Sequence, residues 1–385
     1  MIAKRCQQVQ PFYVMDLLAK AKQLQASGRD IIHLEVGEPD FTTPQPIIDA
    51  GISALKEGKT HYTAALGLLE LRQAVAARYQ QTDQLSINAK RVVITPGSSS
   101  ALHLLMHALV NPGDGVMLTD PGYPCNKHFV TLVGGEVLPI NLSAADGFQL
   151  NVEQLDEAWK PNAKVLLIAS PANPTGTVLS QDRLKQIVLW AKAKSIRLIV
   201  DEIYLGLHYD VDAVTALALS DEIIVVNSFS KYFSMTGWRL GWMVVPEGEV
   251  EYFDRLAQNL YLCAPTPSQY AALAAFSDDT LAILELRRDT FQRRRDVLLP
   301  ALKDIGFGVA TPPQGAFYIY AESSQFAADS FKWCHALLEQ AGVAITPGRD
   351  FSSQSAERYV RFAYTTDESR LLEAVDRIHS YQRSR

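Results

Sequence analysis

The chain has 385 residues, of which 48% are hydrophobic and 20% charged, and its formal net charge is −6. Its length allows a large buried core and about two domains. The acidic balance and the lack of a basic stretch argue against a nucleic-acid partner.

The sequence also argues against a membrane span, a secretory signal and a metal-binding or redox role for the cysteines. No apolar run reaches the roughly 18–20 residues that span a bilayer, so we expect no membrane partner. The N-terminal segment lacks the apolar core of a secretory signal, which predicts a cytoplasmic protein. The cysteines have neither metal-ligand nor redox spacing, so we expect reduced thiols and no bound metal. They are Cys6, Cys125, Cys263 and Cys334.

Hydrophobic periodicity and Pro or Gly punctuation predict a helix, a strand and a helix at residues 12–27, 31–36 and 44–56. From residue 66, strands alternate with helices over about 200 residues, which predicts a mostly parallel α/β sheet. Several of these strands are apolar throughout, as when helices cover both faces. The expected strands are 91–95, 115–118, 136–140, 165–169, 196–200, 223–227 and 242–245, and the expected helices are 66–80, 101–109 and 183–194.

The pattern changes after Pro265. Residues 267–305 form a long, charged helical stretch whose Arg-rich run, Arg287 to Arg295, we interpret as a solvated helix face linking two domains. A strand at 316–320, a helix at 330–341, a strand at 359–363 and a closing helix follow. This final part predicts a smaller α+β domain.

Lys231 is the first candidate for chemistry, because it follows an apolar strand and lies between serines and Arg239. Nearby cations and burial would lower its pKa toward the free amine that forms an imine. Taken alone, an ordinary surface lysine in a turn is the better interpretation.

The segment Asp201-Glu-Ile-Tyr204 follows a second apolar strand. In open α/β sheets, ligands bind at the carboxyl ends of strands. A carboxylate there can hold a pyridine nitrogen protonated, as pyridoxal phosphate (PLP) chemistry requires, and Tyr204 would reach the cofactor's phenolic oxygen. A helix cap is the structural alternative for Asp201.

Two loops add polar groups at strand ends. In Ser170-Pro-Ala-Asn-Pro-Thr-Gly176, a rigid turn presents Asn173, which could donate to the same phenolic oxygen. In Thr95-Pro-Gly-Ser-Ser-Ser-Ala101, Ser99 and Ser100 lie at a helix N-terminus, which suits an anion. The loop lacks the lysine of a nucleotide-binding P-loop, so a monophosphate fits better than a nucleotide. Ser228 and Arg239 could contact the same phosphate.

Two further residues fit a flat cofactor and an acidic substrate. Tyr123 follows another strand and could stack on an aromatic ring, although turn packing is an alternative. Arg361 lies within an apolar strand and needs an acid partner, which a substrate carboxylate would supply in a bidentate fork. An internal salt bridge is the alternative for Arg361.

Together these residues resemble the PLP-dependent class I/II aminotransferase family of fold type I, from Val36-Gly-Glu-Pro-Asp-Phe41 to Val360-Arg-Phe362. The family pattern S-x-S-K-x-x-x-x-G-x-R-x-G reads here as Ser228-Phe-Ser-Lys-Tyr-Phe-Ser-Met-Thr-Gly-Trp-Arg-Leu-Gly241, with one residue more between lysine and glycine. The Asn-Pro-x-Gly and Asp-Glu-x-Tyr motifs match as well.

The resemblance implies a large PLP-binding domain at 45–285, with a mostly parallel seven-stranded sheet, and a small α+β domain from 1–44 and 286–385. It implies that Lys231 forms the imine with the cofactor and moves the substrate's Cα proton. It also implies that the backbone at Gly37 touches substrate, and that Tyr62 reaches the phosphate of a neighbouring subunit in a homodimer. The remaining roles follow those given above for Ser99, Ser100, Tyr123, Asn173, Asp201, Tyr204, Ser228, Arg239 and Arg361.

The expected reaction exchanges an amino group between an L-amino acid and a 2-oxo acid. A C–S β-lyase of the same fold is the alternative, because lysine, acid and phosphate site are shared. Phe12, Tyr13 and Val14 are expected near the pocket, and no cation for a second substrate carboxylate is evident. The sequence therefore favours neutral, hydrophobic or aromatic amino acids.

Overall fold

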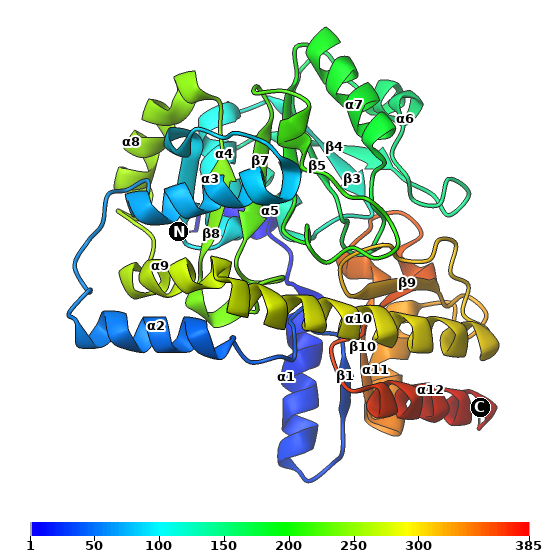
Figure 1. Ribbon diagram of the computed structural model, residues 1–385. Coiled ribbons are helices and arrows are strands. Elements are labelled where there is room, and N and C mark those ends of the chain that lie inside the picture. The colour runs from blue at the N-terminus through cyan, green and yellow to red at the C-terminus, as the bar shows by residue number, and fades with distance from the viewer. Residues whose placement is uncertain (1, 385) are drawn as a thin grey trace.

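The computed structural model describes residues 2–384 and contains two sheets. The larger has seven strands in the order β2-β8-β7-β6-β5-β3-β4, in which β8 runs antiparallel to both neighbours. The mixed α/β fold with a mostly parallel seven-stranded sheet is thereby confirmed (Figure 1). The strands are β2 (Val92–Thr95), β3 (Gly115–Asp120), β4 (Glu136–Asn141), β5 (Ala163–Ala169), β6 (Arg197–Asp201), β7 (Ile224–Ser228) and β8 (Gly241–Val244).

Strands β2, β8 and β7 of this sheet are buried at every residue, which explains why their sequences are almost entirely apolar. Side chains of alternate residues enter different clusters. Val93 and Val226 pack in the cluster that includes α4, whereas Val92 and Val225 pack in the main core on the other face. The helices of this part of the chain are α2 (Gln45–Lys56), α3 (Leu69–Asp83), α4 (Ser98–Leu109), α5 (Cys125–Leu132), α6 (Val152–Ala158), α7 (Gln181–Ala193), α8 (Val250–Leu260) and α9 (Thr266–Leu273).

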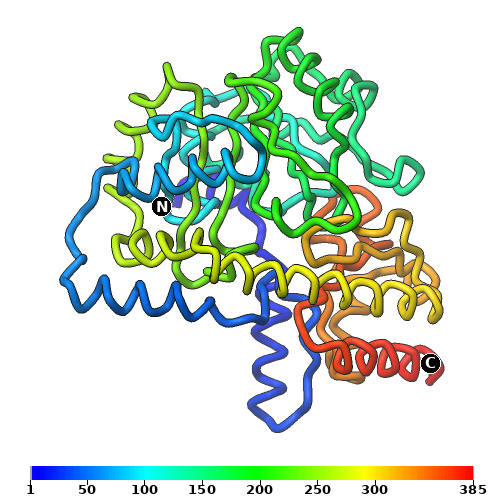
Figure 2. The backbone as a smooth tube through the Cα atoms, viewed as in Figure 1, coloured from blue at the N-terminus to red at the C-terminus, as the bar shows by residue number. Residues whose placement is uncertain are grey.

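The smaller sheet has four strands in the order β1-β10-β11-β9 and unites the two ends of the chain. Its strand β1 pairs in parallel with β10, so segments from the N-terminal and C-terminal parts of the chain lie side by side (Figure 2). Its elements are α1 (Tyr13–Ala26), β1 (Ile32–Leu34), β9 (Tyr318–Glu322), α11 (Ser330–Ala341), β10 (Val343–Pro347), β11 (Tyr359–Ala363) and α12 (Glu368–Arg383).

The charged stretch at 267–305 forms two helices. A 3-10 turn at Ala274–Phe276 and the N-cap Ser277 separate α9 from α10 (Asp278–Asp304). In Figure 1, α10 runs from beside α9 to the smaller sheet. It crosses the expected 285/286 domain boundary without a break, and that division stays a prediction.

The interpretation of the Arg-rich run as a solvated face was wrong for two of its members. Arg294 and Arg295 are buried. Arg294 forms a two-bonded ion pair with Asp40, at 2.7 and 2.8 Å, and Arg295 pairs with Asp210 at 2.6 Å. Arg295 also pairs with its neighbour Asp296 at 2.7 Å. Asp40 and Asp210, however, lie far away in sequence, so the local pattern of charges did not reveal them.

The periodicity analysis also missed some short elements, namely α5, α6, α8 and β10. Both α5 and α6 have at most eight residues, too few for a clear helical period. Strand β10, Val-Ala-Ile-Thr-Pro, is buried throughout and shows no alternation.

Candidate active site

A cavity of about 400 Å³ lies at the carboxyl edge of the large sheet. Strands β2, β3, β5, β6 and β7 are parallel, so the loops that follow them meet at this edge. Residues from the N-terminal segment and the smaller sheet complete the wall. The predicted site residues that line it are Gly37, Ser99, Tyr123, Asn173, Asp201, Tyr204, Lys231, Arg239 and Arg361.

Lys231 lies in the turn after β7, and its Nζ donates a hydrogen bond to the carbonyl oxygen of Gly37 at 2.6 Å. Burial and the positive charge of Arg361 lower the pKa of Lys231 to about 8. A primary amine with this pKa is far more often neutral at physiological pH than an exposed lysine. Lys231 is therefore suited to nucleophilic attack and proton transfer.

Asp201 is the last residue of β6 and is buried at the base of the cavity. Burial raises its pKa to about 7, while the N–H of Ile203, which donates to Oδ1 at 3.1 Å, and the charge of Lys231 oppose this shift. A protonated ring nitrogen placed against the carboxylate would stabilise its ionised form.

An anion-binding arrangement forms where α4 begins. Gly97 caps the helix at φ 78° and ψ 165°, and the first N–H groups of a helix have no intrahelical partner. A Cβ at Gly97 would lie 2.4 Å from Nη2 of Arg239. Glycine thus lets the guanidinium approach the helix N-terminus, and Ser99 faces the same cavity.

Arg361 of β11 approaches from the smaller sheet and is buried. Its Nη1 donates to Oδ1 of Asn173 at 2.9 Å, and its Nη2 donates to the carbonyl oxygen of Glu35 at 2.7 Å. Its Nε lacks a hydrogen-bond partner among the described residues. The internal salt bridge, which was the alternative interpretation of Arg361, is absent from the described contacts, so a buried guanidinium faces the cavity with donor capacity to spare.

Three predicted residues lie away from the cavity lining. The hydroxyl of Ser100 donates to the carbonyl oxygen of Pro96 at 3.0 Å. The Ser228 hydroxyl accepts from the N–H of Ser230 at 3.0 Å and so braces the loop that carries Lys231. Tyr62 is 80% exposed and borders a separate surface hollow.

Several lining residues were not among the predicted site residues. Tyr318 begins β9, and its hydroxyl lies 2.7 Å from that of Tyr204. It falls in an expected strand, but local sequence gave no sign of which face it uses. Phe12 and Val14 line the cavity as expected, whereas Tyr13 packs on Phe331. The other unpredicted members of the lining include Met15, Leu18, Glu38 and Ser230.

The residues present fit PLP. A lysine with a lowered pKa, a buried carboxylate at a strand end and a glycine-lined helix N-terminus beside an arginine surround one cavity. These are the groups required for an aldehyde, a pyridine nitrogen and a phosphate, respectively. Fold and site together define the class of PLP-dependent enzymes.

Comparisons with known proteins identify the family. The model of "Aminotransferase class I and II" matches residues 29–378. A valine–pyruvate aminotransferase of Mycobacterium tuberculosis is 39% identical over 97% of this chain and 96% of its own. A (5-formylfuran-3-yl)methyl phosphate transaminase of Methanocaldococcus jannaschii is 37% identical over 99% of both chains. The crystal structure of a Mycobacterium tuberculosis aminotransferase superposes with a TM-score of 0.96, at 39% identity and 100% coverage of both chains.

This chain belongs to the aminotransferase class I and II family and is a PLP-dependent aminotransferase. The C–S lyase alternative is not favoured, because these relatives are named for amino transfer. Among residues 2–384, no helix is long and apolar enough to cross a membrane. The same residues contain no group of three or more His, Cys, Asp or Glu side chains that could hold a metal ion.

Proposed function

We propose that this aminotransferase takes its amino group from neutral L-amino acids with apolar or aromatic side chains. The observation that carries this proposal is the composition of the cavity wall. Phe12, Val14, Met15 and Leu18 present an apolar surface. The cations of the described lining are Lys231, Arg239 and Arg361.

Each of these three cations already has a proposed role, so none is left to pair with a second substrate carboxylate. Lys231 acts on the reacting carbon, Arg239 on the cofactor phosphate and Arg361 on the substrate α-carboxylate. A second substrate carboxylate would meet apolar side chains and the carboxylate of Glu38, which this chain places in the same wall. Burying an unpaired carboxylate there is unfavourable. The name of the valine–pyruvate relative supports the same donor class.

When bound, PLP supplies the electron sink for the reaction. We propose that Asp201 holds the ring nitrogen, that Tyr204 and Asn173 donate to the phenolic oxygen, and that Tyr123 stacks on the ring. Ser99, Arg239 and the N–H groups of α4 hold the phosphate, while Ser100 and Ser228 brace these loops.

On the substrate side, Arg361 and Asn173 orient the α-carboxylate, and the backbone at Gly37 closes the pocket. Lys231 Nζ removes the proton from the substrate Cα and returns it on the cofactor side. Its lowered pKa suits both directions of this transfer.

An amino-donor panel tests the substrate class. We expect kcat/KM for valine, leucine or phenylalanine, with pyruvate or 2-oxoglutarate as acceptor, to exceed that for aspartate by tenfold or more, since an unpaired buried charge costs more than about 1.4 kcal/mol. A preference for aspartate would contradict the donor class but not the amino-transfer reaction. Pyruvate and ammonia from cystathionine, without amino transfer, would contradict both.

We further propose a cytoplasmic homodimer in which Tyr62 reaches the partner's phosphate site. Its 80% exposure, close to the exposed Leu69, leaves it available to a second copy. All four cysteines are free, as in a reducing compartment. Light scattering should give twice the chain mass of 42.6 kDa. Tyr62→Phe should weaken PLP retention, and Tyr252→Phe, an exposed control, should leave it unchanged. A monomer that retains PLP normally would contradict the proposal.

A further inference from the structure

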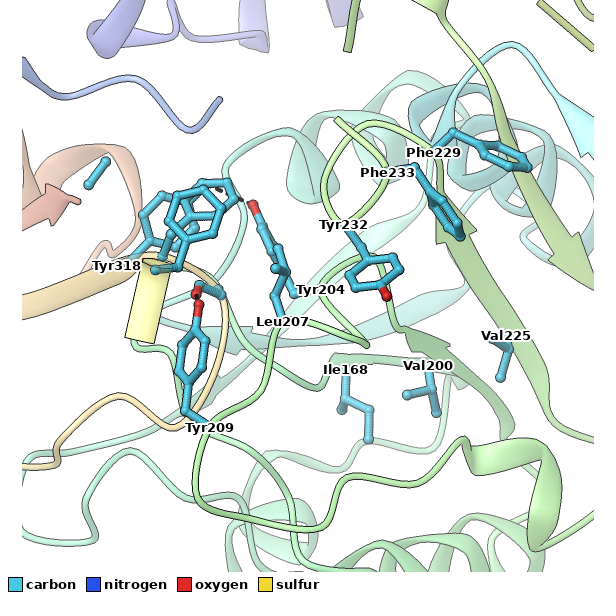
Figure 3. Packing of buried hydrophobic residues seen from close by; sticks show 14 of the residues in the cluster. Ile168, Val200, Tyr204, Leu207, Tyr209, Val225, Phe229, Tyr232, Phe233 and Tyr318 are labelled. Atoms are coloured by element: carbon cyan, nitrogen blue, oxygen red, sulfur yellow. Dashed lines mark hydrogen bonds between the residues drawn. The ribbon is translucent and has the colours of Figure 1, made fainter. Parts of the chain in front are cut away.

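Tyr318 contacts three of the groups to which substrate or cofactor roles are assigned. Its hydroxyl lies 2.7 Å from the Tyr204 hydroxyl, a bond drawn in Figure 3. Its ring centre lies 4.1 Å from the guanidinium carbon of Arg361. A Cβ on Gly37 would come within 2.3 Å of the same hydroxyl, so the Gly37 loop also packs against Tyr318. The side chain is buried and lines the cavity.

Either tyrosine could donate the hydrogen bond that joins them, and the role proposed for Tyr204 decides the direction. Burial raises the pKa of both hydroxyls, so each oxygen keeps its proton at neutral pH. If Tyr204 uses its O–H to donate a hydrogen bond to the cofactor's phenolic oxygen, its own oxygen remains free to accept one. Tyr318 then donates to Tyr204, and this second bond strengthens the first, because hydrogen bonds in a chain polarise one another.

The ring of Tyr318, in contrast to its hydroxyl, contacts the guanidinium of Arg361. A guanidinium over an aromatic face at this distance gains a cation–π attraction. Arg361 packs between Tyr318 and Phe351, whose ring centre lies at 4.7 Å. The orientation of its free Nε therefore depends on the Tyr318 ring.

We propose that Tyr318 is a positioning residue that aligns the Tyr204 hydroxyl through its own hydroxyl and the Arg361 guanidinium through its ring. It thereby links the site for the cofactor's phenolic oxygen with the site for the substrate carboxylate. The proposal rests on the roles proposed above for Tyr204 and Arg361.

Two substitutions separate the hydroxyl from the ring. Tyr318→Phe removes only the O–H. In the holoenzyme, the visible absorbance of the bound cofactor should then titrate at a higher pH, because a weaker donor stabilises the phenolate less. The KM for the amino donor should change less than twofold. Tyr318→Leu also removes the ring, and its KM should rise by about 2- to 30-fold, the range of a cation–π contact.

Tyr204→Phe and the double variant complete the cycle. Tyr204→Phe should raise the titration midpoint further than Tyr318→Phe. Adding Tyr318→Phe to it should cause no additional shift, since the hydroxyl acts through Tyr204. Tyr320→Phe is the matched control, because Tyr320 is a buried residue of the same strand that packs on Tyr359. It should leave both measurements unchanged.

The outcomes distinguish the two levels of the proposal. A shift in Tyr204→Phe without a shift in Tyr318→Phe would overturn the role of the Tyr318 hydroxyl and leave that of Tyr204 intact. No shift in either variant would overturn the role of Tyr204 and the relay with it. An unchanged KM in Tyr318→Leu, with thermal unfolding close to that of the wild type, would overturn the role of the ring.

Discussion

At the scale of single residues, the ammonium group of Lys231 is partly withdrawn from water and shares one cavity with the cations Arg361 and Arg239. Both effects favour the neutral amine, which is the reactive form. In the absence of a reaction partner, the hydrogen bond to the Gly37 carbonyl holds Nζ of Lys231 in the cavity.

We therefore expect the cofactor-free enzyme to capture PLP with a rate that rises through a pKa near 8, well below the ordinary 10.5. Stopped-flow absorbance in phosphate-free buffer measures this rate. A rate that keeps rising up to pH 10, as expected for an exposed lysine, would contradict the lowered pKa of Lys231. Lys231→Ala is the control and should show neither capture nor amino transfer.

Gly97 offers a second test at this scale. Gly97→Ala places a Cβ 2.4 Å from Arg239 and also strains a left-handed backbone. Gly113→Ala is the matched control, because it has a φ of +87° but no heavy atom within 4 Å of the added Cβ. Both variants should lose stability by about 1–3 kcal/mol.

Only Gly97→Ala should raise the dissociation constant for PLP, by about tenfold or more if one charge-assisted contact is lost. Equilibrium dialysis of PLP against both variants measures the difference. Equal PLP affinity in the two variants would show that Arg239 does not depend on the space at Gly97.

At the scale of elements, the sequence predicted the strands that carry the site, but not the side chains that join distant segments. Apolar runs followed by polar or turn-forming residues placed Asp201, Asn173 and Lys231 at strand ends, and the structure brings all three to one cavity. Tyr318 and Asp350 escaped notice because their partners lie in other elements.

Asp350 shows this limitation most clearly. Its Oδ1 accepts from the N–H of Tyr13 at 2.9 Å, and its Oδ2 accepts from the N–H of Val14 at 2.8 Å. It therefore caps α1 from 337 residues away. A capping search restricted to neighbouring residues cannot find such a partner.

Removing this cap should loosen the part of the cavity wall that α1 supplies. Asp350→Ala should destabilise the start of α1 by about 0.5–2 kcal/mol. The KM for apolar amino donors should rise, and residues near Phe12 should become more sensitive to protease. Asp16→Ala, an exposed substitution in the same helical turn, is the control. Equal KM values in the two variants would argue against a role for the cap in substrate binding.

At the scale of the whole molecule, α10 connects the two sheets, and its buried arginines fix it to loops that precede it in the chain. Arg294 joins α10 to Asp40, three residues after Gly37. The Arg-rich run was predicted to be solvated because a pattern of charges does not reveal whether distant carboxylates reach it. Burial of an arginine is favourable only when such a partner is present.

Asp40→Ala should therefore leave the buried guanidinium of Arg294 without its main carboxylate partner. The weaker contact of Arg294 with Asp367, at 3.6 Å, offsets part of the loss. We expect a loss of about 1–3 kcal/mol in the free energy of unfolding. Asp49→Ala, an exposed control on α2, should change it by less than about 0.5 kcal/mol. Denaturant titration of both variants decides the point, and equal midpoints would contradict the expected role of Asp40.

The parallel pairing of β1 with β10 has a consequence for the order of events during synthesis. Strand β1 leaves the ribosome early, but its partner begins only at Val343. Arg361 is synthesised later still, so its hydrogen bond to the Glu35 carbonyl can form only then. The growing chain can assemble the large sheet first, while its N-terminal segment stays without a partner. Substrate selection, which is assigned to Arg361 and the N-terminal cavity wall, can therefore be complete only after nearly the whole chain has emerged.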